Sequence, residues 1–430
     1  MKKKINIAIV GLGNIGLSLY KNLNINQNSI EKKTNVKIDI KYVSAKNRLK
    51  KRPINIPKKK WLKNYKEAYK KSDIDIVVEL IGGSEGAAKN LIFNSIKNKK
   101  HVVTANKALM SAHGDTLSKM AEANRVNLEF EAAVAGGVPI IRSLKEGLIT
   151  NKLNKIYGIL NGTSNFILSK MSETSKSFNE VLQEAQKLGY AESNPSDDIN
   201  GYDAKSKIQI LSALAFNIFI NKSKINVEGI KNVDDVDIKN AKNLGYKIKH
   251  LAIAELKSGK LIQRVHPCMV KKDTYISNIN GVLNTVIVEG KPIGKFAIQG
   301  EGAGSGPTTS ALVSDICSVL RGNIKFPFSI SNKERKVLRY KGISERFFSA
   351  YLRFEVLDKS GVLSNITNIF SKNNVSIKRV VQTPNKRKNS SSIIIITHKS
   401  KDFSLNKILK IIGKKPYNKK KPKLIRIDNN

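Results

Sequence analysis

The chain has 430 residues, 40% of them hydrophobic, and a formal net charge of +43 at pH 7. The length allows about three domains, and no apolar run reaches the roughly 20 residues that crossing a bilayer requires, so we expect no membrane partner. Lysines are spread along the whole chain without a basic stripe interleaved with aromatic residues, which argues against a specific nucleic-acid partner and predicts only nonspecific binding to polyanions at low salt.

The start of the chain predicts a strand rather than a targeting segment. Residues 4–10 are apolar after a basic start, but they run directly into a glycine loop and no small-residue cleavage site follows. The two cysteines, Cys268 and Cys317, lie far apart in the sequence. Isolated thiols of this kind are typical of a reduced compartment, so we expect a cytoplasmic protein.

A glycine loop follows the first predicted strand. It reads GLGNIG, with Gly11, Gly13 and Gly16, and a helix-like segment comes next. Between a strand and a helix this pattern is typical of a dinucleotide site. Gly11 allows the tight turn, Gly13 lets the backbone approach a pyrophosphate, and Gly16 packs the helix on the strand. The alternative is an ordinary turn between a strand and a helix.

The second predicted strand, 36–43, bears on the choice of dinucleotide. An NAD site usually has an acidic residue at the end of this strand to hold the ribose 2′-hydroxyl. Here the strand is followed by SAKNR, which contains no acid. Lys46 and Arg48 could instead pair with a 2′-phosphate, so NADP is favoured and NAD stays possible. The alternative is a solvated basic loop in a basic protein.

Further strands at 74–80, 101–104 and 126–135 alternate with helices, which predicts a doubly wound parallel sheet. Lys107 follows the strand at 101–104 directly, at the edge where open α/β sheets bind ligands, although it could be a surface lysine at a helix start. Glu131 precedes a glycine turn, and such a segment can offer several oxygens to a hard cation. The alternative is a turn that only crosses between domains.

An acidic stretch dominates the second part of the chain. Residues 188–214 carry four carboxylates followed by a lysine, and Asp203 and Lys207, four residues apart, share one face of a predicted helix. Lys207 lies beside an apolar stripe, so burial would lower its pKa and make it a better proton donor. The alternative is an ordinary surface ion pair. Strands at 249–256 and 261–265, with few helices between, predict a mixed sheet.

The last third of the chain holds another glycine-rich loop and a small terminal module. The loop at 300–309 opens an apolar helix and could return to the cofactor. Residues 331–348 are polar and charged and are predicted to be a linker. From residue 349 the pattern is strand, helix, strand, strand, helix and a possible last strand, which is typical of a ferredoxin-like domain.

Taken together, these stretches resemble homoserine dehydrogenase over essentially the whole chain, and the tail resembles an ACT domain. The matching blocks are GLGNIG, VTANKALM, EAAVAGGVPIIRSL, NGTSNFIL, LGYAESNPSDDINGYDAKSKIQIL, RVHPCMV and GEGAGSGPTTSALVSDI, with LDKSGVLSNITNIF and NVSIKRVVQ in the tail.

The expected fold is therefore α/β with three parts. A Rossmann-like doubly wound parallel sheet is expected at 1–138, completed by a helix at 306–322. An α+β catalytic and dimerisation domain with a mixed sheet is expected at 139–305. A ferredoxin-like ACT domain at 349–430 is expected after the linker at 331–348.

The resemblance implies NAD(P)H-dependent interconversion of L-aspartate 4-semialdehyde and L-homoserine, a step of threonine, methionine and isoleucine biosynthesis. Lys207 would be the acid/base residue, Asp203 would orient it or the substrate, and Lys107 would lie beside the nicotinamide and the substrate. Glu192 would hold the substrate amino group, and Asp198 would also bind substrate.

The resemblance also implies cofactor and metal residues. Leu12, Asn14, Ile15 and Gly302 match cofactor contacts of the family and join Gly11, Gly13, Gly16, Lys46, Arg48 and Lys107 as candidates. The side chain of Glu131 and the backbone oxygens of Val134, Gly136 and Val138 match the sodium site of the family.

Partners follow from the same resemblance. Threonine is the expected effector at the ACT domain, and the alternative is a module that only aids dimerisation. A homodimer or homotetramer is expected. The alternative to an enzyme is a non-catalytic regulator that binds a dinucleotide and an amino acid, against which the presence of both Lys107 and Lys207 argues.

Overall fold

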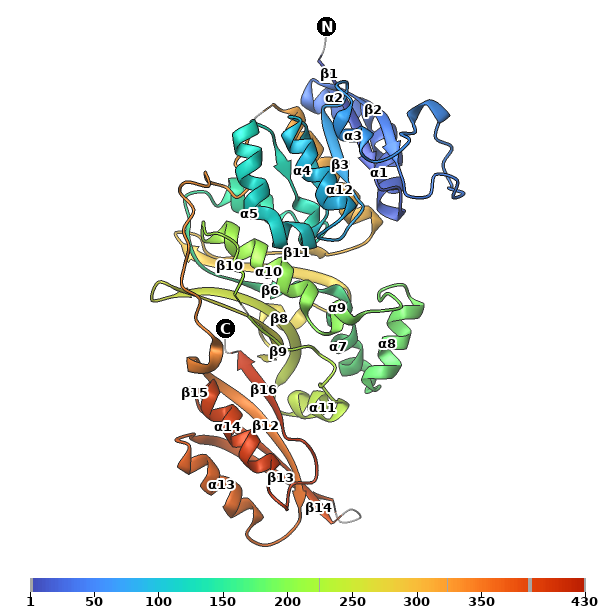
Figure 1. Cartoon of the computed structure of the whole chain (residues 1–430). Coiled ribbons are helices and arrows are strands. Elements are labelled where there is room, and N and C mark those ends of the chain that lie inside the picture. The colour runs from blue at the N-terminus through green and yellow to red at the C-terminus, as the bar shows by residue number, and fades with distance from the viewer. Residues whose placement is uncertain (1–2, 224, 323, 386–388, 429–430) are drawn as a thin grey trace.

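The computed structural model describes residues 3–223, 225–322, 324–385 and 389–428. Figure 1 shows three parts in a row: the N-terminal parallel sheet at one end, a mixed sheet in the middle and the ferredoxin-like domain at the other end. None of the helices in these ranges combines the length and apolar character that crossing a bilayer would require. The predicted fold class is confirmed, while the exact domain boundaries stay predictions.

The N-terminal sheet has five parallel strands in the order β2-β1-β3-β4-β5. It is built from runs of Ile and Val that are buried on both faces, as parallel sheets require. Its strands are β1 (Lys4–Val10), β2 (Lys37–Ser44), β3 (Ile76–Glu79), β4 (His101–Thr104) and β5 (Leu128–Glu129).

One expected strand of this sheet is much shorter than predicted. The stretch 126–135 is apolar, but only β5 is extended, and a 3-10 turn at Glu131–Ala133 follows it. Ala135 and Gly136 then take positive φ values of 57° and 46°. The backbone turns here because the Glu131 carboxylate accepts hydrogen bonds from the backbone N–H groups of Ile141 and Arg142. The prediction of a strand up to residue 135 was wrong for this reason.

Helices cover both faces of the parallel sheet. The helix after the glycine loop, α1, packs beside α12, which returns from far along the chain, and the Thr309 hydroxyl donates to the Ser18 hydroxyl at 2.9 Å. On the other face α4 packs against α5. The helices of this part are α1 (Asn14–Ile25), α2 (Gln27–Thr34), α3 (Glu67–Lys70), α4 (Ala87–Lys97), α5 (Lys107–Asn124) and α12 (Ser305–Leu320).

The central mixed sheet carries helices on the side that faces the first domain and at one end (Figure 1). Its strands are β6 (Lys152–Ile159), β7 (Asn226–Val227), β8 (Tyr246–Lys257), β9 (Lys260–Lys271), β10 (Leu283–Lys291) and β11 (Gly294–Glu301). Its helices are α6 (Ile140–Arg142), α7 (Gly162–Thr174), α8 (Phe178–Lys187), α9 (Ser196–Ile199), α10 (Tyr202–Ala215) and α11 (Asp235–Asn243).

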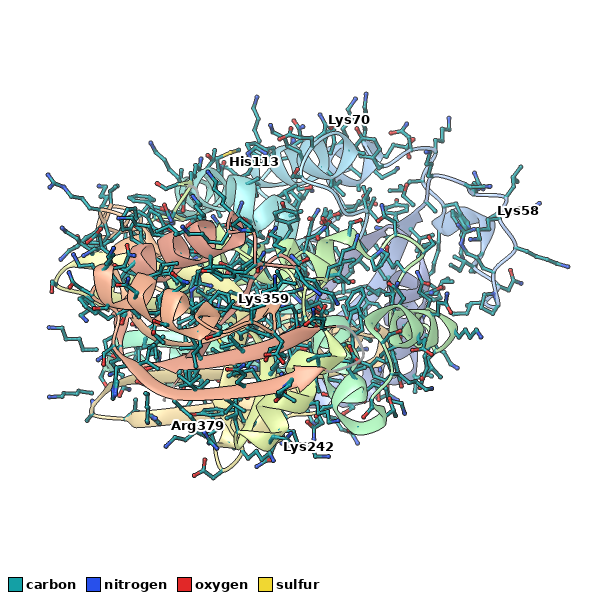
Figure 2. All side chains as sticks on the ribbon, turned by 90° about the horizontal axis from the view of Figure 1, so that it is seen from below. Lys58, Lys70, His113, Lys242, Lys359 and Arg379 are labelled. Atoms are coloured by element: carbon teal, nitrogen blue, oxygen red, sulfur yellow. The ribbon has the colours of Figure 1, made fainter. Side chains whose placement is uncertain are left out.

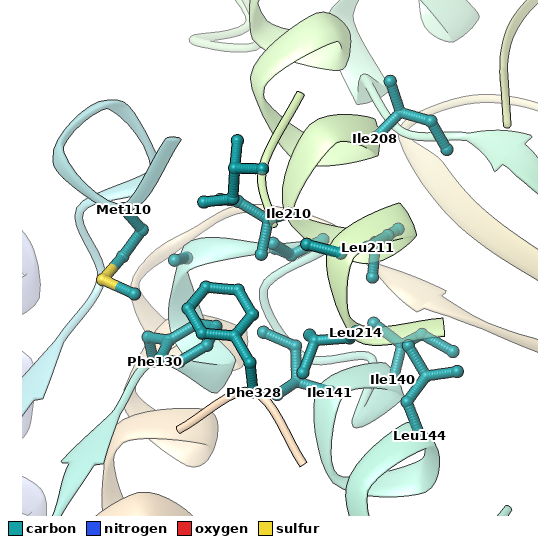
Figure 3. Close-up of a cluster of buried hydrophobic side chains, with 14 of the residues drawn as sticks. Met110, Phe130, Ile140, Ile141, Leu144, Ile208, Ile210, Leu211, Leu214 and Phe328 are labelled. Atoms are coloured by element: carbon teal, nitrogen blue, oxygen red, sulfur yellow. The ribbon is translucent and has the colours of Figure 1, made fainter. Parts of the chain in front are cut away.

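The helix α10 is buried on nearly every side. Figure 3 shows Ile210 and Leu211 in one apolar cluster with Met110 and Phe130 of the first domain and with Phe328. The core therefore runs across the junction of the two domains, and it fixes α10 against α5. Such close packing positions any polar side chain at the end of α10 with little freedom.

The C-terminal part is a four-stranded antiparallel sheet with two helices, as predicted, and the last strand is present. Its strand order is β16-β12-β14-β13. Its elements are β12 (Phe347–Leu357), α13 (Val362–Lys372), β13 (Ile377–Asn385), β14 (Ser390–Thr397), β15 (Ser400–Lys401), α14 (Asp402–Gly413) and β16 (Lys423–Asp428).

This sheet continues the central one. β16 pairs in parallel with β9, with Arg426 opposite Cys268 and Asp428 opposite Val270, so that a single sheet of 11 strands crosses the junction. The preceding segment is also tied down. The buried Arg335 guanidinium lies 2.7 Å from Asp115 and donates to the backbone oxygen of Ile218. The segment predicted as a linker thus packs against the first domain and the central domain.

Candidate active site

Three charged side chains meet where the first two domains join. Lys107 is the first residue of α5, directly after β4 of the parallel sheet, while Asp203 and Lys207 lie in the first turns of α10. Asp203 forms an ion pair with each lysine. Its Oδ1 lies 2.5 Å from the Lys107 Nζ, and its Oδ2 lies 2.8 Å from the Lys207 Nζ. The structure therefore brings together three of the residues singled out in the sequence.

Local structure explains why these side chains are held in place. Gly201 has a φ of 85°, a left-handed conformation that lets the chain turn into α10 and puts Asp203 in its first turn, where the helix dipole favours a negative charge. Asn106 caps α5 by accepting the N–H of Leu109, and its amide donates to the Gly83 oxygen at 2.8 Å. The base of Lys107 is fixed by that cap.

Asn161 organises the acidic side of the site. Its amide donates to Asp198 at 2.7 Å and to Asp203 at 2.9 Å, and its oxygen accepts the N–H of Ser164 to cap α7. Asn161 belongs to the NGTSNF block of the sequence, and no role was predicted for it. An Asn directly before a helix start is a typical N-cap, which predicts the contact to Ser164 but not those to the two carboxylates.

The pKa values of the two lysines are shifted in opposite directions. Burial, with Lys107 adding to it, lowers the pKa of Lys207, whose side chain is 9% exposed, although Asp203 opposes the shift. Burial also acts on Lys107, but Asp203 outweighs it and raises the pKa of Lys107. Burial alone would raise the pKa of Asp203, yet the two ammonium groups hold it well below its ordinary range. Lys207 is therefore the ammonium that gives up a proton more easily.

Two further acids were assigned to the substrate. Asp198 lies at the edge of the same network, where burial raises its pKa and the Asn161 amide opposes that shift. Glu192 is exposed in the loop before α9, and its side chain makes no hydrogen bond or ion pair with the residues that the structure describes. The structure thus joins Asp198 to the lysines but leaves Glu192 outside their network.

The glycine loop has the shape that a dinucleotide needs. A side chain at Gly11, whose φ is 108°, would overlap the Leu80 carbonyl, and one at Gly16 would overlap the Gly11 carbonyl. Gly13 has open space in front of it instead, so its backbone can be approached by a phosphate. Asn14 and Ile15 form the first turn of α1, which aims its N–H groups at the same space, and Leu12 is buried behind it.

The basic residues after β2 lie next to this loop. The Gly11 N–H donates to the Ser44 oxygen at 2.9 Å, and the chain continues into Lys46 and Arg48, which are both exposed. The guanidinium carbons of Arg48 and Arg52 lie 5.8 Å and 5.1 Å from the centre of the Trp61 ring. Arg52 was not predicted to matter here, because only the fold of the loop brings it to Trp61, where it donates to the backbone oxygens of Asn47, Arg48 and Lys50.

The second glycine loop runs past the turn between the domains. A side chain at Gly302 would overlap the Asn284 side chain, and one at Gly136 would meet the Gly302 backbone. The Gly137 N–H donates to the Glu301 oxygen at 3.0 Å. Gly136 must therefore be glycine to allow this close approach of two backbone segments. Gly302 lies at that approach, three residues before α12 begins.

The candidate sodium residues line that same turn. The Glu131 carboxylate accepts the N–H groups of Ile141 and Arg142 at 2.8 Å and 2.7 Å, and burial raises its pKa to about 7. The Val138 oxygen accepts the Ile140 N–H. In the described ranges no three His, Cys, Asp or Glu side chains gather as a metal site. One carboxylate with backbone oxygens is a weak, oxygen-only donor set, which suits a monovalent hard cation and not a transition metal.

The chain is similar to known proteins over nearly its whole length. Residues 11–131 match the family model for the NAD-binding domain of homoserine dehydrogenase, residues 139–317 match that for homoserine dehydrogenase, and residues 350–416 match that for the ACT domain. The chain is 40% identical to a homoserine dehydrogenase of Neisseria gonorrhoeae, covering 92% of each chain.

Two further relatives span nearly the full length. A homoserine dehydrogenase of Helicobacter pylori is 37% identical, with 100% of both chains covered. The crystal structure of a homoserine dehydrogenase from Thiobacillus denitrificans superimposes with a TM-score of 0.93 at 36% identity, covering 99% of each chain. These findings support an oxidoreductase acting on a CH–OH group and not the non-catalytic regulator. The chain belongs to the homoserine dehydrogenase family.

Proposed function

We propose that the chain reduces L-aspartate 4-semialdehyde to L-homoserine with NAD(P)H, reversibly, as a step of threonine, methionine and isoleucine biosynthesis. The arrangement of Lys107, Asp203 and Lys207 at the junction of a dinucleotide-binding domain and a second domain supports the proposal most strongly. The carboxyl ends of parallel strands, where Lys107 lies, are where such sheets bind their ligands.

The two lysines and their acid can do the chemistry of a carbonyl reduction. The bound dinucleotide supplies the hydride. As negative charge grows on the carbonyl oxygen, a nearby ammonium stabilises it, and Lys207 then donates the proton because its pKa is lowered. Lys107 keeps its positive charge and acts electrostatically. Asp203 positions both ammonium groups, and the Leu160 oxygen holds Lys207 from the other side at 2.8 Å.

The remaining polar groups suit an amino acid substrate. An α-ammonium needs carboxylate acceptors, which Asp198 offers at the edge of the network and Glu192 offers from the exposed loop before α9. We assign substrate binding to these two residues.

We propose NADP as the preferred dinucleotide, with NAD also accepted. Lys46 and Arg48 follow β2 beside the glycine loop and are exposed, so both can pair with a 2′-phosphate. Arg52 lies over Trp61 and donates to the backbone oxygens of Asn47, Arg48 and Lys50, so it holds the loop that carries them. Guanidinium groups bind phosphate in a bidentate manner, which favours the phosphorylated ribose.

We also propose a sodium ion at the turn between the domains, held by the Glu131 side chain and by backbone oxygens of Val134, Gly136 and Val138. The buried carboxylate, whose pKa is raised to about 7, lacks a close cation other than Arg142 and Lys145 among the described groups. A bound ion would stabilise its charge and lock the turn on which α12 and Gly302 rest.

The assembly and regulation complete the proposal. β11 is an edge strand of the large sheet and could pair with a second copy of the chain. This supports a homodimer or homotetramer. The ACT domain supports control by a small molecule, and we propose threonine as the effector. The free thiols Cys268 and Cys317 fit a cytoplasmic location.

The test of the function is NADPH oxidation by the purified chain with L-aspartate 4-semialdehyde. We expect turnover, and Lys207→Ala should lower kcat by about 10²-fold to 10⁴-fold, the range for loss of a general acid, while NADPH binding measured by fluorescence stays unchanged. Lys205→Ala on the same helix is the matched control. Cofactor binding without turnover by the unmodified chain would contradict the proposal.

A further inference from the structure

A buried carboxylate at the end of β3 has no part in the chemistry described above. Glu79 is the last residue of β3, and its side chain is fully buried. Its Oε1 accepts the backbone N–H groups of Ile81 and Gly82 at 2.8 Å and 2.9 Å, and its Oε2 accepts the Thr104 hydroxyl at 2.6 Å. Among the described residues it has no basic partner. Three donors aimed at its two oxygens suit the ionised form of a carboxyl group, which only accepts.

The hydrogen bonds of Glu79 close into a ring that joins two loops. The Thr104 hydroxyl, which donates to Glu79, accepts the Asn106 N–H at 3.0 Å, and the Asn106 amide donates to the Gly83 oxygen at 2.8 Å. Gly83 directly follows Gly82, so the ring returns to Glu79. The three side chains of the ring are buried, and a connected buried network of this kind makes the elements that it joins rigid.

The ring connects the glycine loop of the dinucleotide site with the first residue of α5. On one side, the Leu80 N–H donates to the Val10 oxygen at 2.8 Å, and a side chain at Gly11 would overlap the Leu80 carbonyl. The loop after β3 therefore packs directly on the glycine loop. On the other side, Asn106 immediately precedes Lys107. The ring thus sets the start of α5 relative to the glycine loop.

The Lys107 side chain depends on this placement. It is 44% exposed, and its ion-pair partner is Asp203, which belongs to the second domain. Its Nζ makes no hydrogen bond to a group of the first domain among the described residues. Within its own domain the ammonium is therefore placed only by the backbone at the start of α5. A charged acceptor suits the task of fixing that backbone, because hydrogen bonds to an ionised group are about twice as strong as neutral ones.

We infer that Glu79 is a positioning residue for the reduction, which through Thr104 and Asn106 holds the Lys107 ammonium where it meets both Asp203 and the carbonyl oxygen of the substrate. The inference rests on the proposed function for the identity of that carbonyl. Without the carboxylate, the start of α5 would loosen and the ammonium would leave Asp203. A small displacement is enough, since a misplacement of about 1 Å can lower a rate by on the order of 10²-fold.

The reactivity of the Lys107 amine tests this position without turnover. Competitive acetylation of the full chain at mildly alkaline pH, read for each lysine by peptide mass spectrometry, measures how much of each amine is free. Burial lowers the pKa of Lys107, but its pair with Asp203 outweighs burial and raises the pKa, which protects the amine. We expect several-fold faster labelling of Lys107 in Glu79→Gln, with Lys205 unchanged as the internal standard. Unchanged labelling of Lys107 in Glu79→Gln would overturn the inference.

Two variants of Thr104 break or keep the ring at a neutral member. Thr104→Val fills similar space but can neither donate to Glu79 nor accept from Asn106, so its Lys107 should be labelled as fast as in Glu79→Gln. Thr104→Ser keeps the hydroxyl and should behave as the parent does. Asp75→Asn is the control at the other end of β3, where Asp75 accepts the Asn6 N–H at 2.7 Å. Equally fast labelling in Thr104→Ser or in Asp75→Asn would indicate general loosening and refute the role of the ring.

A double-mutant cycle separates positioning from a general structural role. In NADPH oxidation with L-aspartate 4-semialdehyde, Glu79→Gln should lower kcat by about 10-fold to 100-fold. In a chain that already carries Lys107→Ala, the same change should lower kcat by less than about 2-fold, because residues that act through one group are not additive. Equal losses in the two backgrounds would contradict the inference. Absence of turnover by the unmodified chain would count against the proposed function alone, since the labelling result decides the inference without it.

Discussion

At the scale of single residues, the candidate active site is a carboxylate shared by two cations. Asp203 is buried and Lys207 nearly so, while the Lys107 side chain is 44% exposed. This asymmetry gives two chemically equal lysines opposite pKa shifts. A buried pair of this kind stabilises a fold weakly, because desolvation offsets the attraction, so its arrangement is better explained by reactivity than by stability.

The pH dependence of the reaction should depend on Asp203. In the reducing direction Lys207 must carry a proton, so kcat/KM should fall at alkaline pH, with an apparent pKa below 10.5 because the pKa of Lys207 is lowered. Asp203 opposes that lowering. Asp203→Asn should therefore move the alkaline limb to lower pH, by about one unit or more, in NADPH-oxidation profiles from about pH 6 to about pH 10. Asp197→Asn in the neighbouring exposed turn is the control, and an unmoved limb in Asp203→Asn would argue against Lys207 as the donor.

Cofactor preference should depend on the cations after β2. Lys46→Glu places a negative charge where a 2′-phosphate is expected, so the KM for NADPH should rise by about 10-fold to 100-fold while that for NADH changes little. Lys37→Glu, at the opposite end of the same strand, should leave both values as they are. Parallel losses for the two dinucleotides in Lys46→Glu would discount the phosphate contact.

Helical spacing and strand ends were enough to single out Lys107, Asp203 and Lys207 from the sequence, because those signals are local. The contacts of Asn161 with the two carboxylates could not be predicted from the sequence. Its amide meets Asp198 and Asp203 only after α9 and α10 fold back onto the start of α7. Arg52 was missed for the same reason, since a loop with no regular pattern carries it to Trp61.

At the scale of elements, the turn after β5 shows where periodicity misleads. An apolar run is ambiguous between a strand and a buried turn, and here the carboxylate of Glu131 decides by accepting two N–H groups of the next helix. The strands β8 and β9 include the predicted 249–256 and 261–265 and run beyond them, and they are buried along nearly their whole length instead of alternating. Helix periodicity is clearer in α13, where Val362, Ile366 and Phe370 are buried four residues apart.

The turn should respond to sodium. If Glu131 and its neighbouring carbonyls hold the ion, thermal unfolding in sodium chloride should occur at a higher temperature than in choline chloride of equal ionic strength. A concentration ten times the dissociation constant gives about 1.4 kcal/mol of stabilisation, which is a rise of a few degrees. Glu131→Gln should lose the difference. Glu146→Gln, in the next turn of the chain and exposed, should keep it, and a sodium effect that survives Glu131→Gln would place the ion elsewhere.

β16 determines whether the ACT domain is separable. The sequence predicts a module joined by a linker, but β16 hydrogen-bonds to β9, and Arg426 pairs with Glu228 of the central domain. A chain that ends before Ser349 would expose the β9 edge and leave Glu228 without that arginine. We expect its Tm to fall by several degrees and its light scattering to increase on heating, because an exposed strand edge promotes association. A truncated chain with the Tm and turnover of the full chain would show instead that the junction adds no stability.

At the scale of the whole molecule, the central sheet carries both junctions. One side of the sheet meets the dinucleotide domain at the candidate active site, and strand β9 pairs with β16 of the ACT sheet. The core cluster around α10 spans the first junction, so the two domains that form the active site are packed as one unit (Figure 3). One continuous sheet therefore links the two junctions.

The net charge of +43 is distributed over all three domains of the chain. Figure 2 shows basic side chains projecting outward on different sides, with Lys58 and Lys70 on the first domain, Lys242 on the central domain, and Lys359 and Arg379 on the ACT domain. A charge spread in this way attracts any polyanion without reading its sequence.

We therefore expect DNA to bind only as an electrostatic side effect. Fluorescence anisotropy with two unrelated duplexes should give equal affinities at about 50 mM salt and a loss of about 10³-fold or more by about 200 mM, because each released counterion adds to the salt dependence. Reversal of a single exposed charge, as in Lys58→Glu, should lower the affinity only slightly, since no patch of the surface carries the interaction. A preference for one duplex that persists at the higher salt would require a defined nucleic-acid face, which the even distribution of lysines argues against.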